Sequence, residues 1–356
     1  MNANRLLSLL FVSILAALAS AAPTPAVAQG FAGLGSDAEG FAIPKPGRGF
    51  SFPEDHGAHP EYRIEWWYVT ATLTGEDGRD YGIQWTLFRT ALAPESREGW
   101  DDPQVWFGHA GLTTPDRHLV GERFARGGIG QAGVEAEPFN AWIDEWQMAG
   151  PSLSDVNLTA QGSDFSYDLD LITDMPFVPQ GQNGYSVKST GGQASYYYSQ
   201  PFYKVSGTLT LPDGDVRVTG TGWLDREWSS QPLEDTQTGW DWFSLVFATG
   251  ERLMGFRLRD TGGPDFTAAT WITADGTPTP FPNGAFGAEP LTVTPVAGRE
   301  VPTRWQVTLP ERDLDVIVEA LNPNSWMETA FPYWEGPVSF TGSHEGRGYL
   351  EMTGYE

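Results

Sequence analysis

The chain contains no cysteine among its 356 residues. Disulfides, a lipid-anchored cysteine and cysteine metal ligands are therefore excluded. Stability must come from buried apolar surface, which a chain of this length can supply, most simply as two domains. The 15 Trp, 20 Phe and 12 Tyr are the main source, and such side chains suit both β-sheet cores and apolar ligand pockets.

Positive charge is scarce, because 21 Lys and Arg stand against 46 Asp and Glu, a formal net charge of −25. Nucleic-acid binding and docking on anionic lipid both depend on basic residues, so neither is expected. The apolar run Leu6–Leu18 is shorter than the roughly 20 residues that span a bilayer. It follows Arg5 and precedes Ala26-Val27-Ala28, which predicts a cleaved secretory signal over residues 1–28. We expect a periplasmic or secreted protein without stable membrane insertion.

Helical periodicity is also scarce, and the chain reads as short β-strands separated by Gly and Pro turns. Residues 29–52 are rich in Gly and Pro and predict an extended arm. Lys204–Leu211 and Val216–Gly222 flank Pro212-Asp213-Gly214-Asp215, a strong hairpin signal. We expect two antiparallel barrels, over residues 53–215 and 216–356.

An internal repeat supports the two-barrel interpretation. Glu65-Trp66-Trp67-Tyr68 opens a strand, turn and strand that ends at Arg89, and Trp240-Asp241-Trp242-Phe243 opens another that ends at Arg259. Two similar β units in one chain could form one pocket between them. Successive strand residues face opposite ways, so Trp66 and Trp67 cannot both point into one barrel, whereas Trp240 and Trp242 share a face.

Several motifs occur together in the order found in one family. They are Glu65-Trp66-Trp67-Tyr68, Phe88-Arg89, Ser195-Tyr196-Tyr197-Tyr198-Ser199, Trp223-Leu224-Asp225-Arg226-Glu227-Trp228, Gly239-Trp240-Asp241-Trp242, Tyr333-Trp334-Glu335-Gly336 and Gly348-Tyr349-Leu350-Glu351-Met352-Thr353-Gly354-Tyr355. From about residue 50 onward, the chain resembles the AttH-type lipocalin-like secreted proteins, distant relatives of carotenoid 1,2-hydratases. The resemblance implies two tandem lipocalin-like (calycin) barrels and a lipid or isoprenoid ligand. The family's label of secreted hydrolases has no support from a Gly-x-Ser-x-Gly motif, which is absent.

Asp225 is the first candidate for chemistry, because it lies between two tryptophans. Apolar walls raise the pKa of a carboxyl and keep it protonated, whereas a nearby arginine lowers that pKa. The hydratase relatives imply that an aspartate at this position donates a proton to an alkene. The alternative is that Asp225 or Glu227 forms an ion pair with Arg226 or Arg89 and holds the barrels in register.

The hydratases carry a histidine upstream of this aspartate, where the present chain has three tyrosines. Tyr196 and Tyr198 are therefore predicted helpers, although tyrosine is a weak acid, which argues against a carotenoid as the substrate. His59, ahead of the Trp66 strand, is a candidate base or donor; its alternative is a hydrogen-bonded loop histidine. His56 and His59 lack further ligands, so neither a metal nor another cofactor is predicted.

The predicted ligand-binding residues surround a pocket within or between the barrels: Trp66, Trp67, Arg89, Trp223, Arg226, Glu227, Trp240 and Trp242. Each tryptophan could instead be a barrel plug or part of an interdomain core. The chain is expected to be a monomer that binds a hydrophobic small molecule. Hydratase-type or hydrolase-type chemistry is one hypothesis. A non-catalytic periplasmic lipid carrier associated with an ABC transporter is the second, and a structural role in the envelope is the third.

Overall fold

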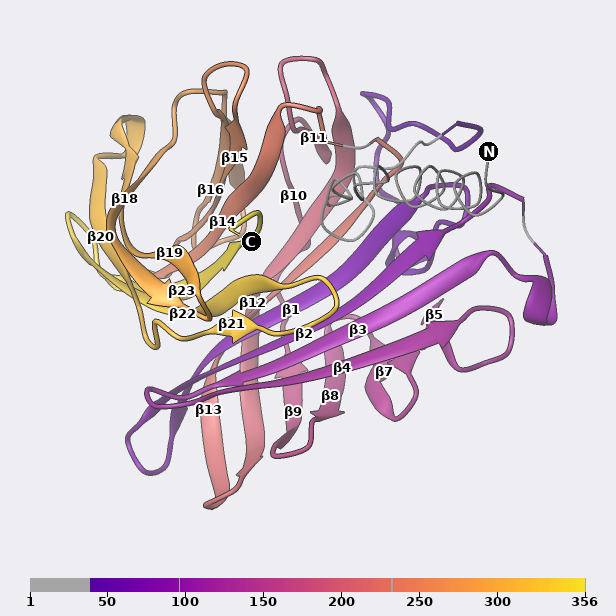
Figure 1. Ribbon diagram of the computed structural model, residues 1–356, viewed down its shortest axis with the longest axis horizontal. Helices are drawn as coiled ribbons and strands as arrows, with labels where there is room; N and C mark the ends of the chain where they lie inside the picture. The colour runs from indigo at the N-terminus through magenta and orange to yellow at the C-terminus, as the bar shows by residue number, and fades with distance from the viewer. Residues whose placement is uncertain (1–38, 96, 232, 356) are drawn as a thin grey trace, which may run out of the picture.

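The computed structural model describes residues 39–95, 97–231 and 233–355. The predicted signal at residues 1–28 and the first part of the arm lie outside these ranges. The described chain is nearly all β, with two large antiparallel sheets, one a nearly closed barrel and the other a half-barrel (Figure 1). This confirms the predicted two-barrel lipocalin-like fold. Within these ranges, no helix is both long and apolar enough to cross a membrane.

The first sheet has 13 strands in the order β4-β3-β2-β1-β13-β12-β9-β8-β7-β6-β5, with β10 and β11 paired to β12. Strand β4 lies against β6, which nearly closes the barrel. The strands are β1 (Ile64–Gly75), β2 (Asp80–Ala91), β3 (Gln104–Thr113), β4 (His118–Arg126), β5 (Ala132–Ala136), β6 (Phe139–Ile143), β7 (Trp146–Ser152), β8 (Asp155–Gln161), β9 (Ser166–Ile172), β10 (Val178–Pro179), β11 (Tyr185–Val187), β12 (Ala194–Leu211) and β13 (Gly214–Ser229).

The second sheet has ten strands in the order β17-β16-β15-β14-β23-β22-β20-β19-β18, with β21 paired to β22. Its strands are β14 (Gln237–Phe247), β15 (Arg252–Asp260), β16 (Phe266–Ile272), β17 (Pro278–Phe281), β18 (Gly287–Val296), β19 (Arg299–Leu309), β20 (Leu314–Ala320), β21 (Trp326–Met327), β22 (Tyr333–Gly342) and β23 (Gly346–Met352). Within residues 39–95, 97–231 and 233–355, helical structure is limited to the short 3-10 turns η2 (Glu54–His56), η3 (Gly99–Asp101) and η4 (Pro310–Arg312).

The change from one sheet to the other falls later than the sequence suggested. The predicted hairpin exists, because Leu211 faces Gly214 at the β12–β13 turn. However, β13 pairs with both β1 and β12 and so belongs to the first sheet. The predicted boundary after residue 215 is therefore wrong, and the second sheet begins with β14 at Gln237.

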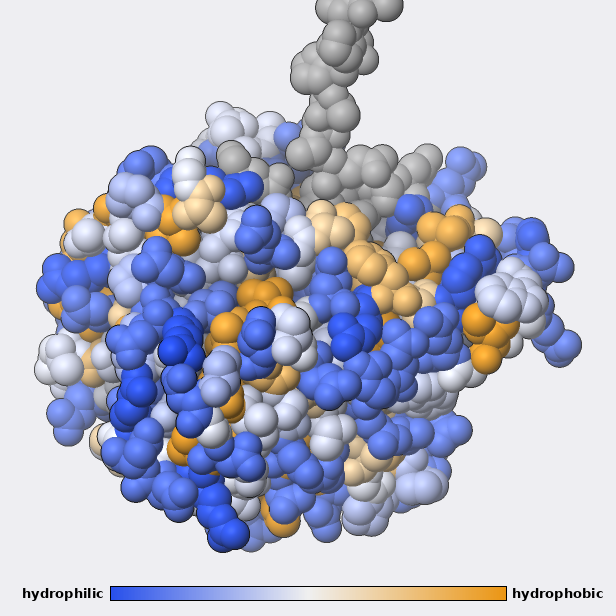
Figure 2. Space-filling view, turned by 60° about the horizontal axis from the view of Figure 1, so that its bottom comes forward, coloured by the Kyte–Doolittle hydropathy of each residue, from blue (hydrophilic) through white to orange (hydrophobic). Residues whose placement is uncertain are grey.

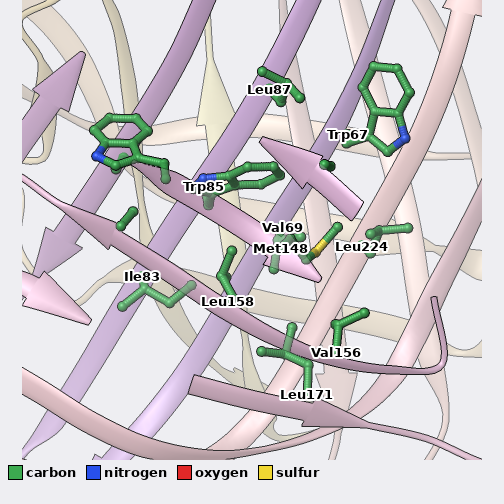
Figure 3. Packing of buried hydrophobic residues seen from close by; sticks show 14 of the residues in the cluster. Trp67, Val69, Ile83, Trp85, Leu87, Met148, Val156, Leu158, Leu171 and Leu224 are labelled. Atoms are coloured by element: carbon green, nitrogen blue, oxygen red, sulfur yellow. The ribbon is translucent and has the colours of Figure 1, made fainter. Parts of the chain in front are cut away.

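Each sheet encloses its own apolar core, and a third cluster lies between the sheets. Figure 3 shows part of the first core, to which β1 contributes Trp67 and Val69, β13 Leu224, β7 Met148 and β8 Leu158. The third cluster takes Tyr68 and Tyr197 from the first sheet and Trp242 and Phe256 from the second. The face in Figure 2 is mainly hydrophilic, with hydrophobic residues in small separate areas. The four residues named from the third cluster are each at most 7% exposed, so the two domains cover them.

The internal repeat is visible in the strand pairing. Strand β1 lies between β2 and β13, and β14 lies between β15 and β23. Glu65 faces Arg89 across β1–β2, as Gly239 faces Arg259 across β14–β15. Tyr68 lies three residues after Glu65, and Trp242 lies three residues after Gly239, so Tyr68 and Trp242 hold equivalent positions in the two units. Equivalent strands therefore meet at the interface, and their outer faces form its walls.

Candidate active site between the two barrels

A cavity of about 120 Å³ lies between the two sheets. An apolar cavity of about 150 Å³ can hold one benzene molecule, so this space suits a small apolar group. Its lining combines aromatic, aliphatic and acidic side chains: Ile64, Glu65, Trp66, Tyr68, Phe88, Arg89, Thr90, Lys188, Gln193, Ala194, Ser195, Tyr197, Asp225, Glu227, Ser229, Gln231, Leu233, Trp240, Trp242, Phe256, Leu258 and Glu351.

Strand alternation decides which tryptophans reach the cavity. Trp66 lines it, whereas Trp67 is fully buried in the first barrel, as expected for adjacent strand residues. Trp240 and Trp242 both line it from β14, and Asp241 takes the opposite face, where it pairs with Arg259. Trp67 is therefore not a cavity residue, contrary to the sequence-based prediction.

Asp225 projects from β13 toward the cavity and is 3% exposed. Its Oδ1 accepts hydrogen bonds from Ser199 Oγ (2.5 Å) and Trp223 Nε1 (2.7 Å), and its Oδ2 accepts one from Tyr197 OH (2.5 Å). Burial raises the pKa of Asp225 to about 7, although the three donors act in the opposite direction. A substantial fraction of this carboxyl is therefore protonated at neutral pH.

The alternative ion pair at Asp225 is not formed. Arg226 faces the opposite side of β13, into the first barrel, where its guanidinium contacts Glu65 and lies 3.8 Å from the ring centre of Trp67. Arg89 also pairs with Glu65. Arg226 does not line the cavity, so its predicted contact with the ligand is wrong, whereas Arg89 does line it.

Glu227 lines the cavity beside Asp225 and has different partners. Lys188 Nζ lies 2.8 Å from Glu227 Oε1, and Ser195 Oγ donates to the same oxygen. The Lys188 ammonium also lies 4.4 Å from the ring centre of Phe256 on the second sheet. The ion pair lies within the first unit, and only the contact of Lys188 with Phe256 reaches the second; the alternative offered by the sequence, a pair of Glu227 with Arg226 or Arg89, is not formed, because both arginines pair with Glu65.

The predicted helpers lie elsewhere. Tyr196 and Tyr198 point into the first barrel, where Tyr198 OH lies 2.7 Å from His56 Nδ1. His59 stacks on Trp228 with ring centres 4.0 Å apart and contacts Glu65. It is thus the hydrogen-bonded loop histidine of the alternative interpretation.

The tyrosine between the predicted pair faces the cavity instead. Tyr197 donates to Asp225 and lies 3.2 Å from Trp242 Nε1, which donates to its hydroxyl. The signal that could have identified it is strand alternation. Ser199 faces Asp225 across β12–β13, and Tyr197 is two residues from Ser199 on the same face.

Two further acids were not predicted. Glu351 on β23 lines the cavity, and Glu335 lies opposite it on β22. Trp240 Nε1 donates to Glu351 Oε1 (2.5 Å), and Tyr68 OH donates to Glu335 Oε1 (2.7 Å). Burial raises the pKa of Glu351 to about 7 and that of Glu335 well above its usual value. Both residues belong to motifs that carried the family resemblance, but they face each other only because β22 pairs with β23.

Buried protonatable carboxyls in an aromatic cavity can donate or accept protons where water is largely displaced. In the described part of the chain, no group of three or more His, Cys, Asp and Glu residues is arranged to hold a metal ion. Fold and site together define a two-barrel lipocalin-like protein with an acidic, aromatic cavity at its domain interface.

Comparison with known proteins identifies the family. Residues 43–355 match the AttH-like family, and the chain belongs to it. The crystal structure of a protein assigned as AttH from Nitrosomonas europaea is 32% identical, with a TM-score of 0.80 over 89% of this chain and 100% of that one. Kievitone hydratase from Nectria haematococca shares the fold at 15% identity, with a TM-score of 0.62 over 88% of this chain and 98% of that one. No curated protein matches the sequence.

Proposed function

We propose that the protein is an exported hydratase that binds an isoprenoid-like molecule at the domain interface and adds water across a carbon–carbon double bond. Asp225 is the proton donor. The observation that carries the proposal is a carboxyl that is buried, free of an ion pair with Arg226, and aimed into an aromatic cavity. The fold shared with kievitone hydratase supports this reaction class.

The environment of Asp225 suits protonation of an alkene. A carbon–carbon double bond is a weak base, so its protonation needs an acid that remains protonated in a dry site. The resulting carbocation would lie among the rings of Trp66, Trp242 and Phe256, and aromatic faces attract positive charge. Water then attacks the cation to give an alcohol.

The size of the cavity limits which part of the ligand it accepts. A volume of about 120 Å³ fits one isoprene unit, so a longer molecule would place only its reacting end inside. The half-buried lining residues include the polar side chains of Lys188, Gln193 and Gln231, past which the remainder of the ligand would leave. The proposed substrate is thus an apolar molecule with a double bond near one end.

The carrier hypothesis required a different site. A carrier of a purely apolar molecule is expected to have a cavity with apolar walls alone. The cavity instead contains the carboxyls of Asp225, Glu227 and Glu351. Burying carboxyl groups against a purely apolar ligand costs free energy and gives a carrier no benefit, whereas an enzyme can use them for proton transfer. The lining of the cavity therefore favours the enzyme over the carrier.

The test uses two probes: kievitone, the compound in the name of the fold neighbour, and lycopene, an acyclic carotenoid delivered in detergent micelles. Each is incubated with the protein in D₂O, and the product is examined by mass spectrometry. We expect the gain of one D₂O, with one deuterium on carbon. Asp225→Asn should abolish this product while retaining the circular-dichroism spectrum of the wild type. A folded Asp225→Asn variant with wild-type turnover would refute the role of Asp225.

Export is the second part of the proposal, and it is supported by the residues of the amino-terminal segment. Arg5, the apolar run after it and Ala26-Val27-Ala28 fit a secretory signal. Amino-terminal sequencing of the protein isolated from its own cells should start at Gln29. A protein that retains residues 1–28 in the cytoplasm would contradict this part of the proposal.

A further inference from the structure

The internal repeat places a second carboxyl in the position equivalent to that of Asp225. Asp225 faces Tyr68 across β13–β1, and Glu351 faces Trp242 across β23–β14. Because Tyr68 and Trp242 are equivalent in the repeat, Asp225 and Glu351 are equivalent as well. Both line the same cavity, one from each domain. The site therefore has two approximately symmetric acids rather than one.

The second acid differs from the first in its partner. Glu335 occupies the position opposite Glu351 that Ser199 occupies opposite Asp225. Directly opposed residues on antiparallel strands have Cβ atoms about 5 Å apart, so the two glutamate side chains are close neighbours. Glu335 Oε2 is buried and has no hydrogen-bond donor among the described residues. Two such carboxyls cannot both be ionised, and a proton shared between them supplies the missing donor.

The surroundings decide which of the two carboxyls holds the shared proton. Glu335 is fully buried, whereas Glu351 is half-buried because it faces the cavity. The ionisable groups that act on the pair are Asp225, Glu227 and the phenols of Tyr68, Tyr333 and Tyr349. Two cations line the cavity, and both are paired elsewhere: Lys188 with Glu227 and Arg89 with Glu65. Glu335 therefore keeps its proton to higher pH, and Glu351, the half-buried member whose pKa is raised to about 7, is the one that ionises as pH rises.

We propose that Glu351 is the general base that takes a proton from the attacking water, and that Glu335 is the positioning residue that holds it. This inference rests on the hydratase function proposed above. Asp225 gives its proton to one alkene carbon, and the alkene electron pair forms the new C–H bond. The water oxygen forms a C–O bond to the resulting carbocation, while Glu351 takes one water proton. The product is a neutral alcohol, and the proton gained by Glu351 returns to Asp225 through solvent.

The kinetic test compares Glu351→Gln and Glu335→Gln with Glu319→Gln, an exposed position on β20. Rates of hydration of kievitone and lycopene are measured across pH. We expect a bell-shaped profile for kcat/KM, since one acid must be protonated and the other ionised. Glu351→Gln should lower kcat by about 10²-fold to 10⁴-fold and remove the acidic limb. Glu335→Gln should move that limb to higher pH, because an amide is a weaker donor to Glu351 than a carboxyl is.

A second measurement needs no substrate. Infrared difference spectroscopy with ¹³C-labelled glutamate should detect a protonated glutamate carboxyl at about pH 8 in the wild type, well above the usual pKa of glutamate. The Glu335→Gln/Glu351→Gln double variant should lack it, and Glu319→Gln should retain it. Absence of this band from the wild type would overturn the shared proton and with it the inference.

The outcomes separate the two proposals. An active wild type with an equally active Glu351→Gln variant overturns the base role and leaves the hydratase function intact. A wild type that converts neither probe overturns the hydratase function, and the base role falls with it whatever the infrared result. A profile for Glu351→Gln that retains both limbs shows that another group accepts the proton and also overturns the assignment.

Discussion

Replacement of Asp225 by asparagine should change how the stability of the protein depends on pH. The carboxyl has a pKa of about 7 in the folded state, against an ordinary value of 3.8. Between these pH values, the folded state binds a proton that the unfolded state has released. The free energy of unfolding of the wild type must therefore fall as pH rises through this window. Asparagine has the same shape and no such titration.

The magnitude follows from the size of the window. The two pKa values differ by about 3 units, and each unit is worth about 1.4 kcal/mol. Ionisation of Asp225 thus lowers the free energy of unfolding of the wild type by up to about 4 kcal/mol between about pH 4 and about pH 7. Changed hydrogen bonds to Ser199 and Tyr197 add a constant offset. The diagnostic quantity is the stability difference between variant and wild type as a function of pH.

The assay is urea unfolding followed by tryptophan fluorescence at several pH values. The free energy of unfolding of Asp225→Asn minus that of the wild type should increase by about 4 kcal/mol from about pH 4 to about pH 8. Asp101→Asn, at an exposed position on η3, is the matched control and should give a curve parallel to that of the wild type. Parallel curves for Asp225→Asn would refute the claim that Asp225 is a buried, protonatable acid.

Three further predictions concern its neighbours and the first barrel. Tyr197→Phe removes a hydrogen bond that favours the ionised form of Asp225, so the pKa of that carboxyl should rise. ¹³C NMR of labelled aspartate measures this pKa, and an unchanged value would contradict a role for the hydrogen bond. Glu65→Gln breaks the buried pairs with Arg89 and Arg226 and should lower the free energy of unfolding by about 3–5 kcal/mol in urea; a loss near zero would contradict the network. Burial lowers the pKa of His56 to about 4, so the free energy of unfolding of the wild type should fall by up to about 3 kcal/mol as pH falls from about 6.5 to about 4. His56→Gln should remove this loss. An equal loss in the variant would show that His56 is not the neutral, buried group responsible.

The fold was largely predictable because its signals are local. Turn residues at Pro212-Asp213-Gly214-Asp215 and the density of aromatic and β-branched residues from Ile64 to Thr74 are readable within one hairpin. Alternation also separated Trp66 from Trp67 correctly. The domain boundary was misplaced because the long strand β13 belongs to the first sheet through its pairing with β1, whose residues lie about 150 positions earlier.

The site was less predictable because it depends on register between distant strands. Tyr196 and Tyr198 were chosen over Tyr197, and no local pattern states which of three consecutive tyrosines faces a cavity; the pairing of Ser199 with Asp225 decides it. Glu335 and Glu351 meet only through β22–β23 and reach the cavity only because β23 pairs with β14. The repeat was recognised in its first two strands, and extending it to the third would have aligned Glu351 with Asp225.

The alternation of β13 has a consequence for insertions and deletions in this chain. Asp225 and Glu227 face the cavity and Trp223, a predicted ligand-binding residue that does not line it, lies in the cluster between the sheets, while Leu224, Arg226 and Trp228 face the first barrel. Removal of one residue from the middle of the strand would exchange the two faces, putting a guanidinium in the site and a carboxylate in the apolar core. Length variation among related sequences should therefore avoid this strand and accumulate at the Pro212-Asp213 turn, where an added residue leaves the parity of both faces intact.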